Sequence, residues 1–538
     1  MQDADSDTHI KLSRFTKALV ENFNVIKRGN TLTEGNKITV SPTVSLFALA
    51  YEKFRNILQY QEESVIRRSA IERILIRRLS INPTGKNEAE NLIRELLWAR
   101  YFPNESLNQS DINNVQNVLD KYQLLKKEVI VGRADTKKGF YSSFIFDLMT
   151  CDIEETLAPQ DSKQSSLFTF YIFQVLKDKL KIESIDENTK NSYFFLAIDK
   201  YFNKGDMPYL RYHLFSLYNE KISTLSVEEI RKYSEKFIEN VNSVEKLVKS
   251  ILVERMGRFV KNHIPPFRIL FELFKKKGNN IEKVLEDENT LWIEVEKICR
   301  EKYEYVTNRL NHLAFKAIIY IFLTKMLIAF LAEYPLSLYL YGGINYLALT
   351  INTLFPPLLM FILIGLTKTP DEENTKRLFD RIKDIVDADK TFETTMSFIT
   401  KNAKPRRPAL IFGFTIFYTF TFFITFLLIY LSLNFLGFNV ISQIIFLLFI
   451  SLVSYFAYRI RKIAKQYTLR ENESIFRPFF DIFFMPILSF GQFLSRGLAK
   501  LNFFTAFFDF IIEAPFKLVF EVVEEWISFV RSKRDEIE

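Results

Sequence analysis

From residue 314 to residue 334 the chain reads AFKAIIYIFLTKMLIAFLAEY, and this stretch decides the fold. A helix needs about 20 apolar residues to cross the hydrocarbon layer of a membrane. Three later stretches are as long and as apolar: residues 344–366, 409–433 and 440–458. We therefore expect a polytopic α-helical membrane protein with two transmembrane hairpins, over residues 314–366 and 409–458.

Charged residues flank the four stretches unequally. The turns inside the two hairpins, residues 335–343 and 434–439, carry no charge. Basic residues instead stand around the start of the first span, in the connector between the hairpins and after the fourth span, among them Arg300, Lys302, Arg309, Lys316, Lys404, Arg406, Arg407 and Arg459. Because cytoplasmic flanks are enriched in Lys and Arg, we expect a multi-pass protein of the cell membrane with both termini cytoplasmic. The acidic start, residues 1–7, has no apolar segment of a secretory signal.

Turn-forming residues are scarce along the chain. The 538 residues include 15 Gly and 16 Pro, about half the usual share. This scarcity favours helices over sandwiches, propellers and glycine-rich α/β enzymes. Residues 1–310 therefore predict a large all-α cytoplasmic domain, in which Ser226 and Glu229 form a capping box. Consecutive prolines at Pro265 and Pro266 predict a break and a sub-boundary near 262–280.

Five arginines lie within twelve residues of this domain: Arg67, Arg68, Arg73, Arg77 and Arg78. Guanidinium groups bind phosphate well, but a run of mixed charge is more often a solvated, ion-paired face. We therefore favour an ion-paired surface helix over a phosphate-binding site.

The connector over residues 367–408 predicts a cytoplasmic amphipathic helix. Thr369, Pro370 and Glu372 have the spacing of a helix start. A heptad-like apolar seam follows, formed by Leu378, Ile382, Ile385, Phe392, Met396 and Ile399. We expect this seam to pack within the same chain rather than against a second copy.

Residues 459–538 predict a basic juxtamembrane segment followed by amphipathic helices. The formal net charge of the chain is +8. Because basic residues gather next to the fourth span, they favour anionic lipid headgroups over nucleic acid. The candidate contacts are Arg459, Arg461, Lys462 and Lys465. Apolar stretches at 478–494 and 503–530 favour interfacial helices, since a third hairpin would export two basic residues at its turn.

Lys325 is a charged residue near the middle of the first span, where an ammonium group costs roughly 3 kcal/mol. Glu333 lies about 12 Å further along a straight helix, too far for a direct pair. Asn345 and Asn352 share one face of the second span, which predicts a polar contact between Lys325 and Asn352. This intramembrane polar cluster (Lys325, Glu333, Asn345 and Asn352) either lines an ion or proton path or joins two helices. We favour the second role.

Motifs for catalysis or cofactor binding are missing from the sequence. The four histidines are scattered, the two cysteines lie at 151 and 299, and neither a nucleophile elbow nor a dinucleotide-binding loop occurs. We therefore expect no enzyme, no cofactor and no metal. The favoured function is a membrane-tethered helical scaffold or interaction module with protein partners, and the alternative is a subunit of an ion or small-solute transporter or channel.

Overall fold

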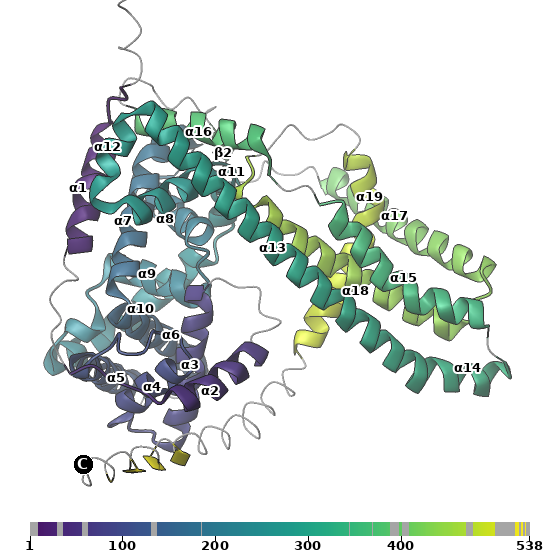
Figure 1. The fold of residues 1–538 in the computed structure, drawn as a ribbon, viewed down its shortest axis with the longest axis horizontal. Coiled ribbons are helices and arrows are strands. Elements are labelled where there is room, and N and C mark those ends of the chain that lie inside the picture. Colours follow the sequence, from purple (N-terminus) through teal and green to yellow (C-terminus); the bar gives the residue numbers. More distant parts are fainter. Residues whose placement is uncertain are drawn as a thin grey trace, which may run out of the picture.

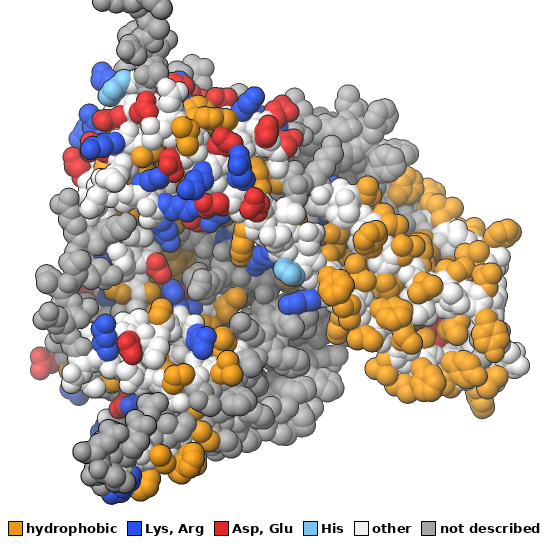
Figure 2. Space-filling model, in the orientation of Figure 1, with side chains coloured by type: hydrophobic (Ala, Val, Ile, Leu, Met, Phe, Trp, Pro, Cys, Tyr) orange, Lys and Arg blue, Asp and Glu red, His pale blue; other side chains and the backbone are white. Residues whose placement is uncertain are grey.

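The computed structural model describes residues 9–28, 36–55, 63–130, 137–183, 185–343, 345–367, 370–387, 397–400, 408–469 and 477–500, with a few residues between 522 and 533. The chain is predominantly helical. Figure 1 shows a rounded body of many helices on the left and an elongated bundle on the right, with one long helix running from the body into the bundle. Figure 2 shows that the bundle presents mainly hydrophobic side chains, whereas the body presents charged ones.

Twelve α-helices precede the long helix in the described part of the body. They are α1 (Arg14–Arg28), α2 (Pro42–Arg55), α3 (Glu63–Ile81), α4 (Glu88–Trp98), α5 (Gln109–Ile130), α6 (Lys138–Leu157), α7 (Pro159–Leu176), α8 (Glu187–Phe202), α9 (Met207–Tyr218), α10 (Val227–Val248), α11 (Ile251–Lys277) and α12 (Ile281–Glu286). Short side chains cap several of them: Asp186 caps α8, Asp206 caps α9 and Ser226 caps α10. The predicted capping box of Ser226 and Glu229 is confirmed.

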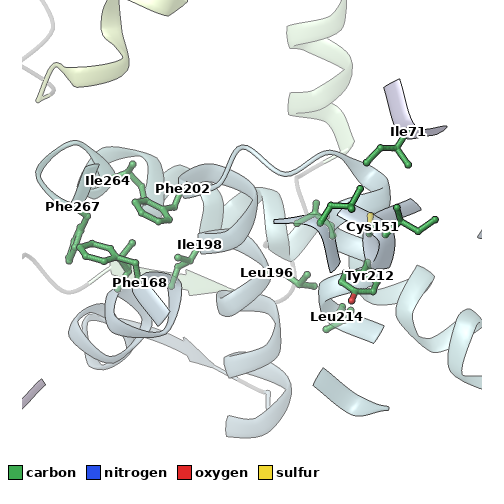
Figure 3. Close-up of a cluster of buried hydrophobic side chains, with 14 of the residues drawn as sticks. Ile71, Cys151, Phe168, Leu196, Ile198, Phe202, Tyr212, Leu214, Ile264 and Phe267 are labelled. Carbon is green, nitrogen blue, oxygen red and sulfur yellow. The ribbon is translucent and has the colours of Figure 1, made fainter. Parts of the chain in front are cut away.

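Aromatic side chains fill the core of the body. The Phe168 ring of α7 stacks on the Phe202 ring of α8 at 5.7 Å, and it lies 4.9 Å from the Phe271 ring of α11. Figure 3 shows Phe168, Phe202, Ile264 and Phe267 gathered at one end of this core, and Cys151, Tyr212 and Leu214 at the other. Paired rings of this kind add to the gain from burying apolar area.

Helix α11 continues through Pro265 and Pro266 over 27 residues, so the helix break expected at the two prolines is wrong. Both proline rings are buried, together with Ile264 and Phe267 on either side. Proline removes a backbone hydrogen bond and strains a helix. Burial of this apolar face offsets that strain, because the face packs against the core over the whole length of the helix.

In the part of the chain that the structure describes, four helices are long and apolar enough to cross a membrane. They coincide with the four stretches expected from the sequence. The first continues from α13 (Glu288–Ile328) through the π-helical turn η5 (Ala329–Glu333) into α14 (Tyr334–Tyr341). The others are α15 (Tyr346–Gly365), α17 (Pro408–Phe435) and α18 (Val440–Ala464), which continues into η6 (Lys465–Tyr467).

The two uncharged turns lie at the same end of the bundle. Asn345 donates a hydrogen bond to the Gly437 carbonyl at 3.2 Å, and Asn439 donates one to the Ser337 hydroxyl at 2.8 Å. Gly342 and Gly437 end their helices with left-handed backbone angles, φ 62° and 75°, which glycine adopts without strain. The turns that the sequence placed on one side therefore do meet.

Helix α16 (Glu372–Val386) lies at the opposite end, against the body. Its N-cap is Asp371, which accepts from the Asn374 amide; Thr369 lies outside the described residues. Leu378, Ile382 and Ile385 are buried as expected. The ring of Phe379 meets Trp292 of α13 edge-on at 5.0 Å.

The second half of the seam does not continue this helix. Phe392 and Met396 lie outside the described residues, and Ile399 belongs to strand β2 (Ser397–Thr400). This strand pairs in parallel with β1 (Leu180–Glu183) of the body, with Ile182 opposite Ile399. A β-branched residue fits this edge pairing, so the expected helical seam ends at Ile385. The connector therefore contacts the body through helix α16 and again through strand β2.

Helix α19 (Arg477–Lys500) packs along the bundle. Its Ser489 hydroxyl lies 3.0 Å from the Tyr418 hydroxyl of α17, and its Phe490 ring lies 5.6 Å from Phe426. Gly491 faces α18, where a methyl group at this position would come within 2.1 Å of the Ser451 carbonyl oxygen. The stretch over residues 503–530 lies almost entirely outside the described residues.

We predict that Gly491→Ala separates α19 from α18 and lowers the stability of the protein by about 1–3 kcal/mol, because the added methyl group meets backbone that cannot move aside. Gly497→Ala on the same helix is the matched control, since nothing lies within 4 Å of the methyl group it adds. Thermal unfolding in detergent measures the difference, and equal midpoints for the two variants would contradict this packing.

Candidate functional site

Lys325 and Glu333 form a buried ion pair inside the bundle. The Lys325 Nζ atom lies 3.2 Å from Glu333 Oε2, and the two side chains are 0% and 1% exposed. The prediction that these residues are too far apart is wrong, because it assumed a regular helix. The π-helical turn over Ala329–Glu333 places an extra residue in the turn between them, which changes the direction of Glu333.

Asn352 of the second span completes the cluster. Its Nδ2 atom donates to Glu333 Oε1 at 2.5 Å and to the Ser442 carbonyl of α18 at 3.1 Å. Glu333 thus bonds to both Lys325 and Asn352, where the sequence suggested a contact between the latter two. Among the described residues, no partner donates to the buried Oδ1 atom of Asn352.

Asn345 has a different position from the other three residues of the predicted cluster. Its side chain is exposed and accepts hydrogen bonds from the backbone amides of Leu347 and Ala348, so it caps α15. It lies at the uncharged turns and joins the two hairpins through Gly437. Asn345 therefore precedes the helix instead of sharing a helix face with Asn352, and it does not lie at the depth of the buried charges.

The sequence did not identify the contribution of α18. Ser442 offers a backbone carbonyl, which no side-chain pattern can reveal, and Phe449 places its ring 5.0 Å from Lys325 Nζ. A cation over an aromatic face is stabilised by the ring quadrupole. The cluster therefore joins three helices: α13 with its π-helical turn, α15 and α18.

A small cavity adjoins Glu333 on the side of the uncharged turns. Its volume is about 10 Å³, and its polar lining comes from Glu333, Ser337, Asn345, Asn439 and Ser442. This volume is about what one water molecule needs. The cavity is too small for an organic solute.

The ion pair of Lys325 and Glu333 has no net charge, and this neutrality makes its burial possible. Lys325 supplies one positive charge and Glu333 one negative charge. Burying either charge alone in a membrane is costly, whereas a paired and hydrogen-bonded set is tolerated. The arrangement is suited to joining helices and to exchanging a proton, because a carboxylate and an ammonium group are in contact.

The four basic residues proposed to contact lipid are all exposed. Arg459, Arg461 and Lys462 lie in the last turns of α18, and Lys465 begins η6. This end of α18 also lies near α11 of the body. The hydrogen bond from Lys200, with a smaller effect from the charge of Lys462, holds the pKa of Glu254 below its ordinary value.

The arginines of α3 are not on a surface helix, contrary to the expectation. Arg68 is 3% exposed, and its Nε atom lies 2.7 Å from Glu154 of α6. Arg73 pairs with Glu52 of α2 at 2.8 Å, and Arg77 and Arg78 both pair with Glu95 of α4. Since these partners come from other helices, the ion pairs fix α3 inside the body and leave no free phosphate site at Arg68.

Metal and thiol chemistry have little support in the described residues. No group of three His, Cys, Asp or Glu side chains is placed there to hold a metal ion. Cys151 and Cys299 are both free and buried. Burial raises the pKa of the Cys299 thiol to about 11, so it is a weak nucleophile near neutral pH.

Comparison with known protein families, with curated proteins and with solved structures finds no match for this chain. The fold and the buried cluster are therefore the features of the chain that bear on its function.

We predict that Lys325→Met and Glu333→Gln each destabilise the bundle by about 3 kcal/mol or more, because each leaves the other charge buried without a partner. The double variant should lie within about 1 kcal/mol of the parent protein. Unfolding of all four proteins in mixed micelles gives the coupling between the two sites. Additive effects of the two substitutions would show that the pair does not act as a unit.

Proposed function

We propose that this chain is a multi-pass protein of the cell membrane that holds a helical interaction body at the cytoplasmic face. The observation that carries the proposal is α13, a single helix of 41 residues that belongs to both the body and the bundle. A flexible linker would tether a domain equally well. A continuous helix also fixes the direction in which the domain faces.

The first half of α13 is built into the body. Leu291, Val295 and Ile298 are buried in the core. Ion pairs add to this attachment, with Lys277 Nζ 2.6 Å from Glu294 Oε1 and Lys302 Nζ 2.7 Å from Glu272 Oε1. The second half of the same helix carries Lys325 into the bundle, so no hinge separates the two parts.

Three segments meet where the body joins the bundle. Asn374 of α16 donates to the Tyr303 hydroxyl of α13 at 2.7 Å and to the Tyr467 carbonyl at 3.0 Å, and its Oδ1 atom accepts from the Leu469 amide at 2.9 Å. These bonds connect the first span, the connector and the end of the fourth span. They support a body that is held rigidly at the membrane surface.

The orientation follows from charge. The two uncharged turns lie together at one end of the bundle, while Arg459, Arg461, Lys462 and the body lie at the other. By the positive-inside rule the body and both termini are cytoplasmic. Lys465 and its three basic neighbours then face anionic headgroups of the cytoplasmic leaflet.

The body, in this proposal, binds soluble protein partners near the membrane, and it has no catalytic role and no nucleic-acid partner. Its size supports the assignment, since the helices before α13 supply most of the side chains in the buried apolar core, which continues into α13 and the bundle.

A transporter or channel subunit is the second candidate. The buried cluster of Lys325, Glu333 and Asn352 favours it, because ionisable residues within spans often mark ion or proton paths. The small volume of the adjoining cavity favours the scaffold, since about 10 Å³ does not give a solute a way through.

We predict that reporters placed in the turns at Gly342 and Gly437 lie on the external side, and that reporters at Asp380 and Arg461 lie in the cytoplasm. Membrane-impermeant labelling of intact cells and of opened cells measures each position. A turn reporter on the same side as the Asp380 reporter would contradict the proposed orientation.

We predict that vesicles containing the purified protein show no flux of protons or small ions that depends on Lys325. The comparison is between the parent protein and Lys325→Met, with Lys316→Met as a control on an exposed lysine of the same helix. Flux that is lost in Lys325→Met and kept in Lys316→Met would overturn the scaffold and establish the transporter.

A further inference from the structure

We infer that water and protons reach Glu333 from the side of the uncharged turns, through a dead-end polar well, and that Glu333 is a protonation site open to that side alone. The polar well is the cavity lined by Glu333, Ser337, Asn345, Asn439 and Ser442. The inference depends on the proposed membrane insertion of the bundle and assigns a ligand, the proton, to its buried cluster.

The lining of the polar well changes from exposed to buried along its depth. Asn345 at the turns is exposed, Asn439 is half-buried, and Ser337, Ser442 and Glu333 are buried. The exposed residues lie at the surface end of the bundle, and the carboxylate lies at the inner end. This order is what a path from solvent to Glu333 requires.

The polar well has the size and the polarity that one water molecule needs. Its volume of about 10 Å³ matches one water, and a buried water needs two to four polar partners. The Ser337 hydroxyl, the Asn439 amide and the Glu333 carboxylate supply them. A water at this position lies next to a carboxylate oxygen and can exchange a proton with it.

Apolar side chains close the well on the side of the body. The Phe449 ring lies 5.0 Å from Lys325 Nζ. One turn closer to the body, Ile321 of α13 and Val453 of α18 are buried, and Met360 of α15 is buried two turns beyond Asn352. These residues belong to one continuous buried apolar cluster, so a proton that enters from the turns meets apolar side chains on the side of the body.

Protonation of Glu333 changes the charge of the cluster. A proton from water adds to a carboxylate oxygen, so the pair of Lys325 and Glu333 changes from net zero to net positive. Among the described residues, the titratable groups next to Glu333 are Lys325 and the exposed Tyr334 phenol, both on its own helix. The other polar groups around Glu333 are neutral and belong to Ser337, Asn345, Asn352, Asn439 and Ser442. Among the residues that the structure describes, no other carboxylate lies near this excess positive charge, so acidity on the side of the turns affects the packing of α13.

The access path is tested with thiols in the full-length protein. Ser337→Cys and Ser442→Cys each place a thiol in the polar well, and Ser451→Cys places one that is also buried in α18 but does not line the well. Silver ion is small enough to follow a path of water size. A tag inserted at Gly343 reports which side of a vesicle the turns face.

Silver added on the side of the tag should block Ser337→Cys and Ser442→Cys at least tenfold faster than Ser451→Cys, and silver on the other side should not. Mass spectrometry after denaturation separates these thiols from Cys151 and Cys299. Slow reaction of silver at all three thiols, or fast reaction when silver is added on the side of the body, would contradict the polar well as a path to Glu333. A tag found in the cytoplasm would overturn the proposed orientation instead, so the two failures are distinguishable.

The protonation step is tested by infrared spectroscopy of the same vesicles. Acid on the side of the tag should produce a carboxylic-acid band that is absent in Glu333→Gln and present in Glu304→Gln, a control on an exposed carboxylate of the same helix. Acid on the side of the body alone should not produce it. The absence of a Glu333-dependent band on the tag side, or its appearance with body-side acid, would overturn the assignment.

Discussion

The cost of a charge in hydrocarbon constrains this whole structure. It keeps charged residues scarce along the four apolar helices, while basic residues gather at the end of the bundle opposite the turns at Gly342 and Gly437. It also explains why Lys325 is paired, because Glu333 and the ring of Phe449 lie next to its ammonium group, and Asn352 in turn donates to Glu333. The same rule governs the body, where buried guanidinium groups such as that of Arg68 meet carboxylates from neighbouring helices.

The features that follow from local composition could be predicted from the sequence. Four apolar stretches became four helices of sufficient length to span a membrane, and Ser226 with Glu229 formed a capping box. Features that depend on distant partners could not be predicted. The pairing of Lys325 with Glu333 requires a π-helical turn, which the spacing of apolar residues does not predict. The hydrogen bond that Asn352 donates to Ser442 uses a backbone carbonyl, which residue type does not reveal. Neighbouring acids suggested a solvated helix for the arginines of α3, but only the tertiary fold reveals that they are buried.

Two misjudged segments show how packing overrides local preference. Pro265 and Pro266 stand inside a helix because its apolar face is buried along its length. Ile399 continues a helical spacing in the sequence, yet it pairs with Ile182 in a short parallel ladder. The ladder attaches the connector to the body in addition to Asn374, so the membrane bundle and the body meet through α13, α16 and β2 together.

The uninterrupted course of α13 has a mechanical consequence. A spanning helix adjusts its tilt when the thickness of the bilayer changes, since mismatch between apolar length and hydrocarbon thickness is relieved by tilting. The first half of α13, from Glu288 onward, is part of the body, so a change in the tilt of the spanning half changes the orientation of the body. Thin and thick membranes would then hold the body at different angles to the bilayer.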